Sequence, residues 1–170
     1  MAPIGDTTMA AMNTPGHPAD RSVDHLVVLA DQVASRLLDR TLPKPEWTHE
    51  AHILACVSLV RRLGAPDALA VLRAAIPPYN EATGVANTPT GGYHDTITVY
   101  YVWAIDLLLA EGFTVGELLA HPLVERTALL AWWDKDVLMS PGARASWLPP
   151  TKRDGAGRLP MEYLQPASVS

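Results

Sequence analysis

The sequence has little of what several protein classes require. Among its 170 residues only Cys56 is a cysteine, which excludes an internal disulfide and gives no sign of an oxidising compartment. No apolar run reaches the roughly 18 residues that span a bilayer, and the N-terminal stretch lacks the basic start of a secretory signal. Basic clusters are absent and the formal net charge is −5. We therefore expect a cytoplasmic protein that binds neither nucleic acid nor an anionic membrane surface.

Residues that favour sheets are also scarce. The chain has one Phe and few Ile, whereas Ala and Leu are abundant, which favours helices. Its length fits one domain with a sizeable core. The predicted fold class is all-α, a single-domain bundle of about six helices. We expect a disordered tail over residues 1–20, a helical metal-binding domain over 21–150 and an irregular tail over 151–170.

Helix boundaries follow from caps, prolines and apolar periodicity. The pattern predicts helices at about 23–39, 49–63, 66–76, 94–109, 114–121 and 124–138. Thr48 is a favourable N-cap and Gly64 a favourable stop. Two prolines are expected to end the third helix and leave a loop over 77–93, which we expect to cover a pocket. The fourth helix is apolar nearly all round, which favours a central position, with a homodimer contact as the alternative.

Three histidines are the strongest functional clue. His49 and His52 lie one turn apart on one apolar helix face, and His94 lies on the apolar face of another helix. A buried imidazole is costly unless its nitrogens are hydrogen-bonded or bind a metal. All three are expected in the first turn of a helix, where the dipole favours the neutral form that metals require. The set predicts one divalent ion, zinc, iron or copper, with an open coordination position.

The simpler alternative is that each histidine is a hydrogen-bonded core residue, since histidines near helix starts are common. The spacing is also less specific than His-Glu-x-x-His, which this chain lacks. Cys56 lies on the same face and is predicted to be a buried thiol, with a thiolate ligand as the less favoured reading.

Two carboxylates follow the proposed ligands directly. Asp95 and Glu50 each project about 100° away from the neighbouring histidine, so we predict catalytic roles in proton transfer or in orienting a histidine. The alternative is that each complements the dipole of its helix, and this alternative is strongest for Glu50.

Five further residues are predicted substrate contacts. Arg144, in an otherwise uncharged segment, suits a substrate carboxylate or phosphate, although a surface position or a helix cap is an equal alternative. The others are aromatic or amide residues close to the histidines or in the 77–93 loop: Tyr93, Tyr101, Asn80 and Asn87. Aromatic residues at such positions also serve as plain packing.

Three segments together resemble a group of small uncharacterised bacterial helical proteins. They are Trp47-Thr48-His49-Glu50-Ala51-His52, then Asn87-Thr88 with Gly92-Tyr93-His94-Asp95-Thr96-Ile97-Thr98, and finally Ser140-Pro141-Gly142-Ala143-Arg144. The group has a His-x-x-His helix start, a Tyr-His-Glu-Thr motif and a Ser-x-x-Ala-Arg segment. This chain departs from it by carrying Asp95 where the group has Glu. The resemblance implies a shared site but no particular reaction.

The sequence thus predicts a small metal-dependent enzyme that acts on a small organic molecule. With zinc we expect hydration, elimination or hydrolysis, and with iron or copper an oxidoreductase. The alternative from another class is a non-catalytic helical module that binds a metal or a ligand.

Overall fold

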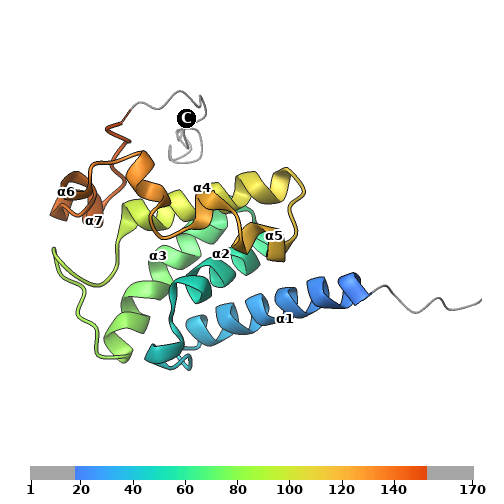
Figure 1. The fold of residues 1–170 in the computed structure, drawn as a ribbon. Coiled ribbons are helices and arrows are strands. Elements are labelled where there is room, and N and C mark those ends of the chain that lie inside the picture. Colours follow the sequence, from blue (N-terminus) through green and yellow to red (C-terminus); the bar gives the residue numbers. More distant parts are fainter. Residues whose placement is uncertain (1–17, 153–170) are drawn as a thin grey trace, which may run out of the picture.

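The structure is a computed structural model that describes residues 18–152 (Figure 1). Seven α-helices lie in that range: α1 Pro18–Leu38, α2 His49–Leu63, α3 Ala65–Ala82, α4 Asp95–Ala110, α5 Val115–Leu119, α6 Lys135–Leu138 and α7 Pro141–Ala145. Three short 3₁₀ helices accompany them: η1 Lys44–Glu46, η2 Pro122–Val124 and η3 Ala128–Ala131. No strand occurs in the described range, so the all-α prediction is confirmed. Most of the two predicted tails lies outside the described residues.

Helix α4 occupies the centre, as its apolar surface predicts. It packs against α2, α3, α5 and α7, while α1 lies along α2 (Figure 1). Residues on both sides of α4 are buried, including Val99, Tyr100 and Ile105. The segment after α5 covers the outer face, where the Trp103 and Trp132 rings lie 5.7 Å apart. That face is therefore covered from within the chain, and the homodimer stays a prediction. Within residues 18–152 no helix is long and apolar enough to cross a membrane.

Helix ends that depend on local chemistry were predicted correctly. The Thr48 hydroxyl accepts a hydrogen bond from the Ala51 N–H at the start of α2. Gly64, with a φ of +79°, ends α2 and directly precedes α3. Thr114 and Glu117 form a reciprocal capping box at α5. Helix α1 begins at Pro18, five residues before its predicted start.

The predicted end of the third helix was wrong. Helix α3 continues through Pro77 and Pro78 to Ala82, so the loop covers only residues 83–94. Each proline removes one helical N–H donor. Burial of Tyr79 and Asn80 beyond the prolines offsets this loss, and the Asn87 amide donates a hydrogen bond to the Pro77 carbonyl at 2.9 Å.

The predicted helix over 124–138 was also wrong, because η2, η3 and α6 replace it. Carbonyls at the start of this segment accept hydrogen bonds from side chains of α2 and α4, and the Glu125 carbonyl also accepts the Ala128 N–H. Tyr100 donates to Leu123, His49 to Val124 and Tyr101 to Glu125, at 2.7–3.1 Å. Helix α7 then forms in the Ser-Pro-Gly-Ala-Arg segment, where the Ser140 hydroxyl caps it.

Candidate functional site

Two adjoining cavities, of about 620 and 490 Å³, lie among η1, α2, α3, α4 and the segment up to α7. His49 and His52 line the first cavity, and His52 and His94 line the second. The wall common to both consists of six residues: Trp47, His52, Ile76, Ile97, Thr98 and Met139. The three predicted histidines therefore border one cavity system, and His52 stands between its two parts.

His49 is half-buried and fixed by two contacts. Its Nε2 lies 2.7 Å from the Val124 carbonyl oxygen, and its ring meets the edge of Tyr101 at 5.3 Å. A carbonyl oxygen only accepts hydrogen bonds, so Nε2 carries the proton. Nδ1 has no hydrogen-bond partner among residues 18–152.

His52 presents the opposite ring nitrogen. Its Nδ1 donates to the Thr48 carbonyl at 2.6 Å, and its ring stacks on Trp47 with centroids 3.6 Å apart. The pKa of His52 is lowered to about 4, mainly because the ring is buried. The nearby His49 and Arg126 lower the pKa further, whereas the hydrogen bond to the Thr48 carbonyl raises it. The ring is therefore neutral near pH 7, and its Nε2 lone pair remains available at the shared wall.

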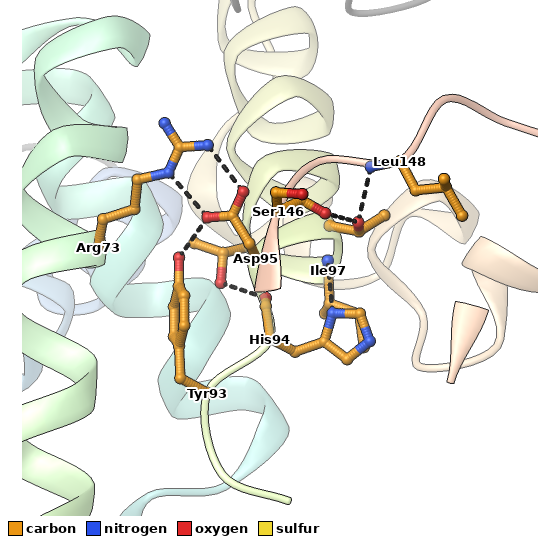
Figure 2. A network of polar contacts seen from close by, with 9 residues as sticks. Arg73, Tyr93, His94, Asp95, Ile97, Ser146 and Leu148 are labelled. Carbon is orange, nitrogen blue, oxygen red and sulfur yellow. Dashed lines mark hydrogen bonds and ion pairs between the residues drawn. The ribbon is translucent and has the colours of Figure 1, made fainter. Parts of the chain in front are cut away.

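His94 differs because both of its nitrogens are engaged. Nε2 donates to the Leu138 carbonyl at 2.8 Å. Nδ1 accepts the Ile97 N–H at 3.4 Å, a bond that Figure 2 shows. His94 thus caps α4 from an extended backbone position and does not lie in the first helical turn as predicted. Burial, as the largest cause, lowers its pKa, and the positive charge of Arg144 adds to the shift.

The metal prediction requires three side chains whose donor atoms converge on one point. No three His, Cys, Asp or Glu side chains of residues 18–152 are placed to hold one ion together. The Nδ1 lone pair of His94 already serves the helix start. Cys56 borders the first cavity, and burial raises the pKa of its thiol to about 12, which keeps it protonated. The three-ligand site does not fit this arrangement of the rings, and it stays a prediction.

Asp95 lies outside both cavities. Its carboxylate accepts two hydrogen bonds of 2.8 Å from Arg73 and one of 2.9 Å from the Tyr93 hydroxyl. Figure 2 shows this carboxylate pointing toward Arg73, on the other side of the helix start from the His94 ring. Asp95 therefore stabilises the contact between α3 and α4. Its predicted part in proton transfer has no geometric support. Glu50 is exposed and borders a separate hollow beside His49.

The predicted substrate contacts divide into two groups. Asn80, Tyr93 and Arg144 line the second cavity and Tyr101 lines the first, although the Tyr93 and Tyr101 hydroxyls are already hydrogen-bonded. Asn87 does not line either cavity. Its Oδ1 accepts hydrogen bonds from Asn80 and from the Tyr93 N–H, so it braces the 83–94 loop. Part of that loop does border the second cavity, as expected.

The cavity-lining residues that sequence reasoning missed include Lys44, Arg126, Lys135 and Met139. Lys44, Arg126 and Lys135 are cations in turns or short helices, where hydrophobic periodicity does not indicate which side chains face a cavity. The chain was compared with protein-family models, curated proteins and solved structures, and none matches it.

Proposed function

We propose that the two cavities bind one small, largely apolar organic molecule. The observation that supports this most directly is the position of His52, a neutral imidazole at the wall that both cavities share. Each cavity has the size of ordinary small-molecule sites, which are mostly apolar with a few oriented polar groups. Trp47, Ile97 and Met139 supply apolar surface beside His52.

His52 acts here as a hydrogen-bond acceptor for the ligand. Its tautomer is fixed because Nδ1 donates to Thr48, so Nε2 accepts and cannot donate. A pKa of about 4 makes it a weak proton acceptor, since efficient general bases titrate near the working pH. Binding of a hydroxyl or N–H group therefore suits this ring better than proton abstraction.

A metal-dependent enzyme is the second candidate, with zinc, iron or copper as its ion. One observation favours it: each of the three histidines donates one N–H to a backbone carbonyl, at 2.6–2.8 Å. Such bonds orient the rings of metal-bound histidines. A three-histidine site additionally requires His94 to release the Ile97 N–H.

Calorimetric titration with a naphthol and its methyl ether tests the proposal. The naphthol should bind at a 1:1 ratio, and His52→Asn should weaken it roughly fivefold, the size of one neutral hydrogen bond. Asn keeps a donor for the Thr48 carbonyl but removes the acceptor at Nε2. The ether, which donates no hydrogen bond, should bind the native protein and the variant equally.

A cavity-filling variant provides the control. Ile97 lines both cavities, so Ile97→Trp should abolish binding of both probes while the fold is kept. Absence of saturable binding, or binding that survives Ile97→Trp, would contradict the proposal.

Zn²⁺ titration tests the second candidate, the metal-dependent enzyme. If three histidines hold the ion, Zn²⁺ should bind about tenfold more weakly to each of His49→Asn, His52→Asn and His94→Asn. Asn at position 94 is itself a good N-cap.

A further inference from the structure

The charged residues around the two cavities all carry the same sign. Four cations line them: Lys44 and Arg144 the second, and Arg126 and Lys135 the first. No Asp or Glu of residues 18–152 lines either cavity, although the chain has 18 acidic and 13 basic residues. A cavity lined by one sign of charge raises the local concentration of ligands of the opposite sign.

Arg144 is the most firmly positioned of these cations. It lies on α7, and its Nη1 donates to the Gly92 and Tyr93 carbonyls at 3.0 and 3.1 Å. These bonds hold the guanidinium against the 83–94 loop. Its field reaches the neighbouring His94, whose pKa it helps to lower.

The same guanidinium has donors left over. Its Nε–H is buried and has no acceptor, and within residues 18–152 Arg144 forms no ion pair. A buried donor without a partner is costly, and a buried charge more so. Asp95, the acidic residue beside His94, cannot compensate, because its carboxylate is paired with Arg73.

Arg73 shows within this chain what the Nε and Nη2 edge of a guanidinium selects. That edge of Arg73 binds both oxygens of the Asp95 carboxylate at 2.8 Å. In Arg144 the loop carbonyls use Nη1 and Nε is buried, so Nη2 is the nitrogen left without an acceptor among residues 18–152. A carboxylate is the group that such a charged donor favours.

We propose that the ligand of these cavities is an organic carboxylate, and that Arg144, assisted by Lys44, binds its charged end in the second cavity. The apolar body then passes Trp47 and His52 into the first cavity. This inference rests on the proposed function, since it assigns a ligand class to the same site. One guanidinium group and one flexible lysine suit a monoanion.

Two probes of nearly the same shape, one charged and one neutral, test the inference. One is a hydroxynaphthoate with its hydroxyl and carboxylate at opposite ends, and the other is the matching neutral hydroxynaphthamide. At neutral pH the carboxylate should bind about tenfold more tightly than the amide, as expected for a charge-assisted bond. Arg144→Gln should remove this preference, and Lys44→Gln should reduce it about threefold.

Lys44→Gln keeps the test decisive if Arg144→Gln disturbs the loop, because Lys44 is exposed and forms no ion pair among the described residues. Arg126→Gln is the matched control, since it removes a cation from the first cavity only. Equal affinity for the two probes, or a preference abolished by Arg126→Gln and retained in Lys44→Gln, would overturn the inference. Failure of both probes to bind would instead refute the proposed function.

Discussion

Residues that are neighbours in the sequence can have different roles in the fold. His94 and Asp95 are neighbours, yet the histidine caps α4 beside the second cavity while the carboxylate faces away and pairs with Arg73. The sequence could place both at a helix start but not assign their partners. Arg73 lies 22 residues earlier, on α3, and only the packing of α3 against α4 brings it to Asp95.

Asp95→Asn should therefore lower the free energy of unfolding and leave ligand binding intact. The substitution removes a charge-assisted pair in which the Asp95 side chain is 6% exposed and that of Arg73 is 43% exposed. Because Arg73 can turn to water, we expect a loss of about 2 kcal/mol, below the 3–5 kcal/mol of a fully buried pair. Urea denaturation measures it. Glu111→Gln, at the exposed end of α4, should change stability by less than about 0.5 kcal/mol.

A change in affinity per folded molecule would contradict this structural role. If Asp95→Asn bound the naphthol probe tenfold more weakly while unfolding at the same urea concentration, Asp95 would belong to the site after all.

Among the helices, sequence prediction succeeded where local chemistry decides the outcome. Thr48, Gly64 and Thr114 act on backbone groups within a few residues, so their effects are visible in the sequence. It failed over 77–82 and 124–138, where long-range contacts decide. Burial of Tyr79 offsets the two prolines within α3. Side chains of α2 and α4 hold the carbonyls of residues 123–125 in an irregular segment.

The 83–94 loop depends on one glycine in particular. Gly92 has a φ of +76°, and a Cβ there would lie 2.6 Å from the Ala86 carbonyl oxygen. We expect Gly92→Ala to lower the free energy of unfolding by about 3 kcal/mol, from backbone strain plus steric overlap. Gly84→Ala is the matched control, because Gly84 has a φ of +77° but no atom within 4 Å of the added Cβ. Its cost should be about 1 kcal/mol, and equal costs in chemical denaturation would show that the close contact is unimportant.

At the scale of the whole molecule, the sequence identified the histidines but not the space between them. Their apolar faces indicated burial, and all three do border one cavity system. The cations that line these cavities come from η1, α6, α7 and the turn after η2. Hydrophobic periodicity in the sequence does not predict how these short elements are arranged. The sequence could therefore indicate Arg144 as a partner for a carboxylate or phosphate, but not the three other cations that line the same cavities.

Buried neutral histidines should make the stability of the whole fold depend on pH. The pKa of His52 falls from 6.5 in the unfolded chain to about 4 in the folded protein, so the unfolded state binds more protons between these values. Stability should be complete above about pH 6.5, decline as the pH falls toward about 4, and lose nothing further from this group below that. His52 alone accounts for about 3 kcal/mol of the loss. The lowered pKa of His94 acts in the same direction.

Urea denaturation at several pH values between about 7.5 and 4 measures this decline, and His52→Asn isolates the contribution of one ring. The variant should lose the part of the slope that His52 contributes, while keeping a donor for the Thr48 carbonyl. His25→Asn, a substitution of an exposed histidine on α1, should keep the slope of the native protein. Acidic residues titrate toward the lower end of the range in all three proteins, so their effect cancels in the comparison. If stability declined with pH equally steeply in the native protein and in His52→Asn, His52 would accept its proton as readily in the folded state as in the unfolded state. That result would remove the basis for a neutral acceptor at the shared cavity wall.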